Sequence, residues 1–394
     1  MDPHSIDKLF IRNVPHILEI IFFSLDYKSF KACFDVCNAW NELLTSDYFQ
    51  RKGKSVFDKE ISEDETNLWR ASRDGILKEV RRLLSNGLVD VNSIRTVGKP
   101  PLLGAAYGGH MEVIKFLLDK KAELEQLDDG GETALYMAAC KGHVDVVKLL
   151  LNKGAKPNVV TKCRATPLYT AARNGHGCTV KVLVEGGANL DKGGYQEQTP
   201  LGAAASAGHY RVATILLDQG AECNKADEFK VTPLYCAARR GRKNVVQLLM
   251  AAGADPNMAD QDAETPLYWA IRRRQRDIAQ LLLAGGADPN KVDEYWGDAS
   301  KSPLHLAARR NLKDAVQLLL DGGADPNLVN QQGNTPLHLA ATWDRKYVAK
   351  MLLARGADPC KLNHNLDTPI ALAVIHGADK VFRLFKEELI QNQL

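Results

Sequence analysis

The sequence Thr-Pro-Leu-His-Leu-Ala-Ala at residues 335–341 decides the fold, because variants of it recur along most of this 394-residue chain. Thr followed by Ala stands at position 133, and Thr-Pro follows every 33 residues from position 166 to position 265. Ser-Pro then follows after 37 residues at position 302, and Thr-Pro after 33 again at 335 and 368. Related pairs at 100 and 66 extend the series to ten units. Self-similarity at such a period predicts an array of stacked repeats rather than one central core.

Each unit carries the same local signals for two helices. A Thr or Ser followed by Pro predicts the start of the first helix, because the hydroxyl caps it and Pro is tolerated in the first turn. Paired Ala, as at Ala171-Ala172, allow a neighbouring helix to approach closely. A Gly then predicts the left-handed end of that helix. A second apolar period follows, and Gly-Ala-Asp-Pro-Asn, as at 323–327, predicts the turn to the next unit.

The units at 302–308 and 335–341 closely resemble the ankyrin repeat. The resemblance covers residues 66–394 and implies an all-α solenoid, an ankyrin array of about ten repeats with β-hairpin fingers between helix pairs. Arg274, Asn311 and Asp344 depart from the family pattern, because they replace the Gly between the two helices. Asn and Asp tolerate a left-handed backbone, whereas Arg does so less readily.

Residues 8–50 follow a different pattern. Apolar residues recur there at helical spacing, which predicts roughly three short helices: Ile17, Leu18, Ile21 and Leu25, then Phe30, Cys33, Phe34 and Cys37, then Trp40 and Leu44. The Val14-Pro15 start and the Val36-Cys37 pair before Trp40 resemble the F-box. Asn38 departs from that family, which has a basic residue at this place.

The F-box resemblance implies docking on the Skp-type adaptor of a cullin–RING ubiquitin ligase. The adaptor-binding face would consist of Val14, Pro15, Leu18, Ile21, Leu25, Val36 and Trp40. The alternative is that these helices only cap the open end of the array. Residues 51–65 are charged and contain one Gly and no Pro, so they predict a rather rigid connection between the two parts.

Composition limits the classes of partner. Lys and Arg number 51 against 48 Asp and Glu, for a formal net charge of +3. This balance argues against general binding to nucleic acid or to anionic membranes. No signal-peptide pattern and no apolar stretch of about 18 residues is found. The eight Cys lack zinc-ligand spacing, so we expect a reduced protein of the cytoplasm, the nucleus or both.

No catalytic motif of a hydrolase, kinase or dinucleotide-binding enzyme is present, so we expect no enzyme activity, no cofactor and no metal. His110, His143, His176 and His209 recur once per repeat. That spacing favours a structural role in the turn before the second helix over metal binding. His305 and His338 are likewise predicted to hydrogen-bond between repeats.

Pairs of Arg mark one candidate binding surface. Arg239-Arg240, Arg272-Arg273 and Arg309-Arg310 follow the same helix in three successive repeats. Because stacked helices lie about 8–10 Å apart, these pairs predict a ladder of positive charge that can bind carboxylate or phosphate. Aromatic residues in the same region complete the predicted target-binding set: Trp269, Tyr295, Trp296 and Trp343. The alternative is internal neutralisation by nearby acids, namely Asp262, Glu264, Asp277, Asp298 and Asp314.

The sequence therefore predicts an ankyrin solenoid preceded by an F-box-like domain, acting as the substrate receptor of a cullin–RING ubiquitin ligase. The box would bind the adaptor, and the ankyrin groove would bind a target through an acidic, phosphorylated or C-terminal degron. The alternative function is that of a scaffold or sequestering protein with no ligase role. A nucleic-acid binder is a third reading, which the near-neutral charge and the lack of a groove-reading motif disfavour.

Overall fold

The computed structural model describes residues 63–85, 89–94, 98–291 and 302–391. The chain divides into two compact units, residues 1–129 and 130–394. The F-box-like segment 8–50 and the connection up to residue 62 lie outside the described residues. Residue 66, the predicted start of the array, lies within a helix of residues 63–73.

In the first unit that helix is followed by α6 (Leu77–Ser85), α7 (Pro101–Gly108) and α8 (Met111–Asp119). α8 packs against both α6 and α7. Buried Leu68, Val80 and Leu117 contribute to this core. Within the ranges given above, no helix of either unit is both long and apolar enough to cross a membrane.

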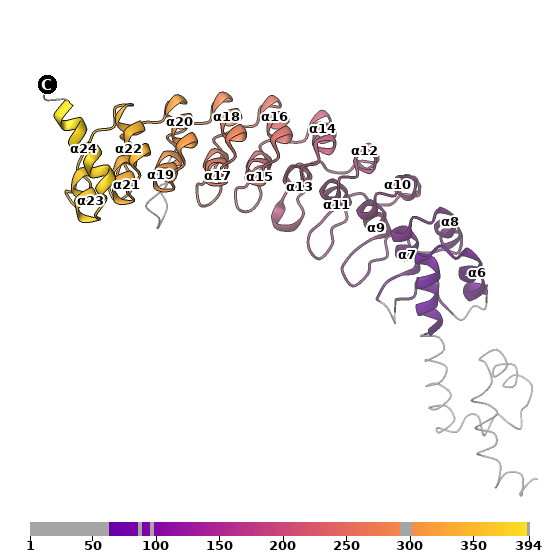
Figure 1. Cartoon of the computed structure of the whole chain (residues 1–394). Helices are drawn as coiled ribbons and strands as arrows, with labels where there is room; N and C mark the ends of the chain where they lie inside the picture. The colour runs from indigo at the N-terminus through magenta and orange to yellow at the C-terminus, as the bar shows by residue number, and fades with distance from the viewer. Residues whose placement is uncertain (1–62, 86–88, 95–97, 292–301, 392–394) are drawn as a thin grey trace, which may run out of the picture. The chain divides into compact units, whose positions relative to one another are not determined.

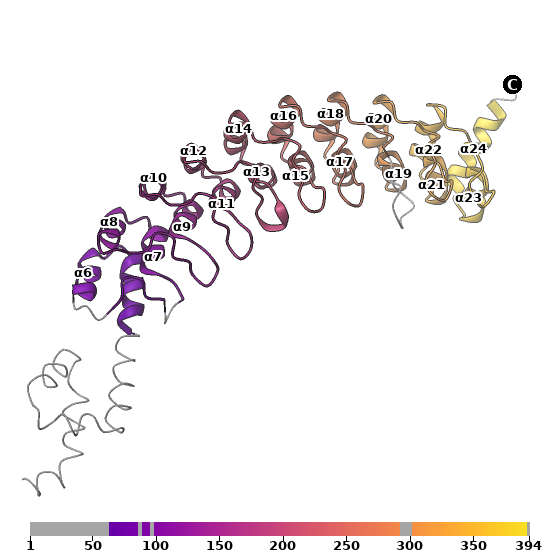
Figure 2. The same cartoon turned by 180° about the vertical axis from the view of Figure 1, so that it is seen from behind.

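The second unit is a series of helix pairs that form two rows, with a loop projecting beside each first helix (Figures 1 and 2). The first helices are α9 (Ala134–Lys141), α11 (Pro167–Asn174), α13 (Pro200–Ala207), α15 (Pro233–Arg240), α17 (Pro266–Arg272), α19 (Pro303–Arg309), α21 (Pro336–Thr342) and α23 (Pro369–Ile375). The second helices are α10 (Val144–Asn152), α12 (Gly177–Glu185), α14 (Tyr210–Asp218), α16 (Lys243–Ala251), α18 (Arg276–Ala284), α20 (Lys313–Asp321), α22 (Lys346–Leu353) and α24 (Asp379–Gln391). We call the surface formed by the first helices and the loops the inner face.

The predicted helix ends are confirmed. The Thr232 hydroxyl oxygen accepts the Tyr235 N–H at 3.2 Å, and the same cap begins every first helix from α9 to α23. Gly241 ends α15 in the left-handed region with φ of 74°. Arg274 and Asn311 take up the same conformation without Gly, with φ of 59° and 57°. The left-handed backbone at the end of the first helix is therefore kept even where another residue replaces Gly.

Burial holds the repeats together. Most first helices carry paired Ala, and Ala237 and Ala238 are fully buried where α15 lies between α13 and α17. In the second helices, apolar residues one turn apart, such as Val246 and Leu249, are equally buried. Each buried Val or Leu stabilises the fold by about 1.5–3 kcal/mol. No repeat could bury these faces alone, so stacking is required.

The loops occupy the places predicted for hairpin fingers. In the loop at 260–264 the Asp260 N–H donates to the Glu264 carbonyl oxygen at 3.2 Å, which closes a tight turn. Several neighbouring loops are joined by a backbone bond, as from the Gln261 N–H to the Phe229 carbonyl oxygen at 2.9 Å. No strand is present in the ranges that the structure describes, so the β-hairpin character of the fingers is not confirmed.

The recurring histidines make the structural bonds predicted for them. His176 Nε2 lies 3.0 Å from the Cys140 carbonyl oxygen, and His209 Nε2 lies 3.1 Å from that of Arg173. Among the described residues, no group of three His, Cys, Asp or Glu side chains is arranged to hold a metal. His305 and His338 bond across repeats, to the carbonyl oxygens of Asn334 at 2.9 Å and Asp367 at 3.1 Å.

His305 makes the stability of the second unit sensitive to acid. Its Nε2–H donates to the Asn334 carbonyl oxygen, so the neutral ring accepts the Ser302 hydroxyl at Nδ1, 2.6 Å away. Burial lowers the pKa of His305 from 6.5 to about 4. Above pH 6.5 the ring is neutral in both states, and below it the unfolded chain takes up the proton first.

We therefore expect the free energy of unfolding to fall between pH 6.5 and pH 4, by roughly 3 kcal/mol from His305 alone. Urea unfolding at pH 7, 5.5 and 4 would measure this loss. A His305→Gln variant has no proton to gain, so its stability should depend less steeply on pH. Equal pH dependence in the two proteins would contradict this assignment.

Candidate functional site

The three Arg pairs lie at equivalent ends of neighbouring first helices. Arg239 and Arg240 are the last residues of α15, and Arg272 and Arg273 close α17. Arg309 and Arg310 close α19 in the same way. α15 packs against α17, and α17 against α19 (Figure 1), so the three pairs follow one another along the row of first helices.

Trp269 on α17 gathers three of these side chains. The guanidinium carbons of Arg239, Arg272 and Arg273 lie 4.7, 4.6 and 5.7 Å from the centre of its ring. A cation over an indole is attracted by the negative face of the ring. Trp269 itself is only 9% exposed, so these guanidinium groups cover the indole and lie between it and the solvent. We call Trp269 with Arg239, Arg272 and Arg273 the Trp269 cluster.

The predicted alternative of internal neutralisation holds for one member of the cluster. Arg272 Nη1 lies 3.0 Å from Glu264 Oε1. Burial raises the pKa of Glu264, and the charge of Arg272 opposes that shift. Among the described residues, no carboxylate forms an ion pair with Arg239, Arg240, Arg273 or Arg310. Asp277, another predicted neutraliser, pairs instead with Lys243 at 2.7 Å.

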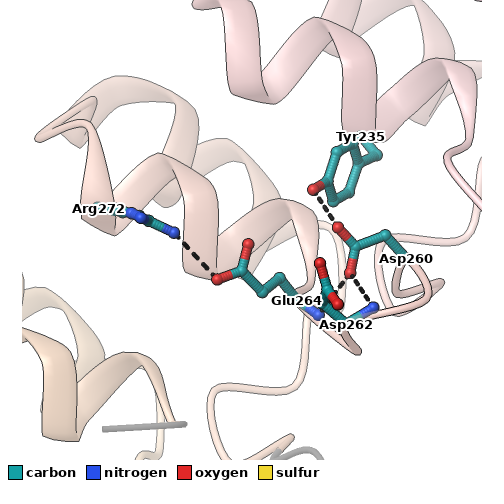
Figure 3. A network of polar contacts seen from close by, with 5 residues as sticks. All are labelled: Tyr235, Asp260, Asp262, Glu264 and Arg272. Atoms are coloured by element: carbon teal, nitrogen blue, oxygen red, sulfur yellow. Dashed lines mark hydrogen bonds and ion pairs between the residues drawn. The ribbon is translucent and has the colours of Figure 1, made fainter. Parts of the chain in front are cut away.

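A second contact network fixes the cluster against the neighbouring loop (Figure 3). The Tyr235 hydroxyl donates to Asp260 Oδ2 in a short hydrogen bond. Asp260 Oδ1 accepts the backbone N–H groups of Asp262 at 3.1 Å and Glu264 at 2.9 Å. Burial raises the pKa of both Tyr235 and Asp260. The Tyr235 ring meets the Trp269 ring edge-on at 6.3 Å, so the loop, α15 and α17 support one another.

A pocket of about 410 Å³ opens on the inner face beside the cluster, and we call it the α15 pocket. Its lining comes from α13, α15 and three loops: Gln196, Gln198, Ser206, Asp227, Phe229, Val231, Tyr235, Cys236, Arg239, Arg240, Asp260, Gln261 and Asp262. Burial raises the pKa of the Cys236 thiol to about 12. The thiol is thus neutral at physiological pH and unsuited to act as a nucleophile.

The other predicted site residues lie elsewhere. Arg310 is exposed, and Trp343 follows α21 with 52% of its surface exposed. The structure does not bring Trp343 onto the Trp269 cluster. Tyr295 and Trp296 fall outside the described residues, as do all the predicted adaptor-binding positions: Val14, Pro15, Leu18, Ile21, Leu25, Val36 and Trp40.

Sequence reasoning named Asp262 and Glu264 of the loop as nearby acids but missed Tyr235 and Asp260. Tyr235 stands where a later repeat has His305, which bonds to a backbone carbonyl oxygen rather than to a carboxylate. The acids of the loop at 260–264 could have been recognised as a cluster. Only the packing of α15 against that loop shows that Tyr235 reaches Asp260.

Comparison with known families agrees with the repeat pattern. The model for ankyrin repeats (3 copies) matches residues 68–161, 154–227, 220–293 and 295–363, which is well over half of the chain. No curated protein matches the sequence. No match supports the F-box resemblance of residues 8–50, which therefore stays a prediction. The chain belongs to the ankyrin-repeat family, whose arrays are generally non-catalytic scaffolds that bind other proteins.

Proposed function

We propose that this chain is a protein-binding receptor whose inner face, from α15 to α19, holds an acidic segment of a partner. The observation that carries this proposal is the Trp269 cluster with Arg240 beside it. Four guanidinium groups gather at the ends of two neighbouring helices, and Glu264 is the one described acid that pairs with them. Like charges held this close repel one another, so an anionic ligand relieves that repulsion.

The geometry suits anions of two kinds. A guanidinium stacked on an aromatic ring keeps its N–H edge free, and that edge binds carboxylate or phosphate with two parallel hydrogen bonds. Each charge-assisted bond contributes about 1.5–3 kcal/mol. Side-chain carboxylates, a phosphorylated residue and a C-terminal carboxylate all present such an anion. The target segment is therefore an acidic, phosphorylated or C-terminal degron.

We further propose that residues 8–50 bind a Skp-type adaptor and through it a cullin. The support is the sequence resemblance to the F-box. In that role the chain catalyses nothing itself, and ubiquitin transfer takes place elsewhere in the complex. The receptor raises the effective concentration of the target near the charged enzyme.

Co-purification of the full chain with a Skp-type adaptor and a cullin tests this second part. We expect the wild type to bind and the triple variant Pro15→Ala/Leu25→Asp/Trp40→Ala to lose binding, because these changes remove the predicted apolar docking face. Thermal melting should stay unchanged, which shows that the array is intact. If the wild type does not bind, the ligase role is wrong and the chain acts as a scaffold or sequestering protein.

A further inference from the structure

The α15 pocket is lined by groups of opposite charge that do not pair with one another. Arg239 and Arg240 come from the end of α15, whereas Asp227 and Asp262 come from two loops. No ion pair joins these four side chains, although Arg272 and Glu264 pair nearby. Cys236 also lines the pocket, and the charge of Asp227 raises the pKa of its thiol whereas the charges of both Arg lower it.

The fold does not require the negative charge of Asp227. Its Oδ1 accepts the N–H groups of Phe229 and Val231, both at 2.9 Å. Asn330 Oδ1 makes the same two bonds in a later loop, to Gln332 at 3.0 Å and Asn334 at 2.9 Å. A neutral Asn therefore closes this turn equally well. The turn does not need the negative charge of Asp227, which is available to bind a cation.

Asp262 is still less engaged in the structure. It is exposed, and its backbone rather than its side chain bonds to Asp260. No described Lys or Arg lies within ion-pair distance of its carboxylate. Asp227 and Asp262 are thus two carboxylates without a cationic partner, beside a pocket large enough for a long side chain.

We propose that the segment bound at Arg239 and Arg240 also carries a Lys or Arg, and that this basic side chain enters the α15 pocket to pair with Asp227 and Asp262. This inference rests on the proposed function, in which the bound segment is acidic. It adds a basic residue to the same segment. The apolar parts of Phe229 and Val231 line the path of the aliphatic stem, which long basic side chains bury while their charge stays solvated.

The ligand is then a mixed-charge motif rather than a purely acidic stretch. Because both sets of charges line one pocket and neighbouring Cα atoms of a peptide lie about 3.8 Å apart, we place the basic residue within two positions of the acidic one. A segment with acids alone would leave Asp227 and Asp262 facing further negative charge.

Selection of phage-displayed random twelve-residue peptides on the full-length protein tests the inference. We expect the wild type to enrich peptides that have Asp or Glu within two positions of Lys or Arg. The double variant Asp227→Asn/Asp262→Asn should keep the acidic preference and lose the basic one. Asp218→Asn is the matched control, because it removes an exposed carboxylate at the end of α14, and it should enrich the same motif as the wild type.

One selected peptide and its Lys→Gln form then give the affinity. Either Lys→Gln in the peptide or the double Asp→Asn change should weaken binding about tenfold, and the two together no further. Enrichment of acidic residues alone, or a basic preference that survives in the double variant, would overturn this inference while the proposed function stands. A wild-type selection without acidic enrichment would overturn both.

Discussion

Arg240→Glu together with Arg273→Glu is expected to weaken binding of an acidic peptide by about a hundredfold or more. Both side chains are exposed and have no acidic partner among the described residues, so their N–H groups are available to a ligand. Loss of two charge-assisted contacts at about 1.5–3 kcal/mol each already accounts for this factor. Fluorescence anisotropy with a labelled peptide from the wild-type selection would measure it.

The control separates the site from the net charge. Lys181→Glu with Arg211→Glu makes the same change of charge on exposed positions of α12 and α14, in the row of second helices. We expect that variant to bind within about threefold of the wild type at physiological salt, where charges at long range are largely screened. An equal loss in both variants would contradict a local site and point to general attraction between opposite charges.

Trp269→Leu is expected to reduce the same affinity on the order of tenfold while the array stays folded. Leu306, Leu339 and Leu372 occupy the equivalent position in later repeats, so Leu is compatible with the backbone there. The change removes the ring that holds three guanidinium groups. Without the ring, each guanidinium side chain has to be ordered on binding, at about 0.5–1.5 kcal/mol for each, so the loss of the platform corresponds to this factor.

Trp269→Phe is the matched variant, since it keeps an aromatic face of smaller size. We expect its affinity to lie between those of the wild type and Trp269→Leu, and thermal melting would show that both variants fold. Unchanged binding in Trp269→Leu would mean that the arginines bind the ligand without support from the indole ring. The Trp269 ring would then have no role in recognition.

Most of the second unit could be predicted from residue types with strict backbone requirements. Thr before Pro specifies a capped helix start, and Thr232 makes the expected bond. Gly at a left-handed position specifies a helix end, as at Gly241. The period then places equivalent residues on one face, so the alignment of the Arg pairs followed from the sequence alone. The hairpin fingers were not confirmed, because each loop forms too few backbone bonds to count as strand.

The spacing of the repeats did not predict which side chains contact one another within the site. The repeat places Trp269 on the inner face, yet its burial depends on where Arg239 and Arg272 turn their guanidinium groups. The pairing of Arg272 with Glu264 and the bond from Tyr235 to Asp260 likewise join residues of different elements. Sequence reasoning offered neutralisation and ligand binding as alternatives. The structure shows Arg272 paired with Glu264, whereas Arg239, Arg240 and Arg273 are exposed and form no ion pair among the described residues.

Photo-crosslinking from single positions tests the central claim most directly. A benzoylphenylalanine at Gln261, exposed at the α15 pocket, is compared with one at Gln247, exposed on α16. Mass spectrometry of the products formed in cells would identify the crosslinked segment of the partner. The account predicts that Gln261 captures a segment with acidic or phosphorylated residues and that Gln247 does not. Capture from Gln247 alone, or of a segment without anionic groups at Gln261, would contradict it.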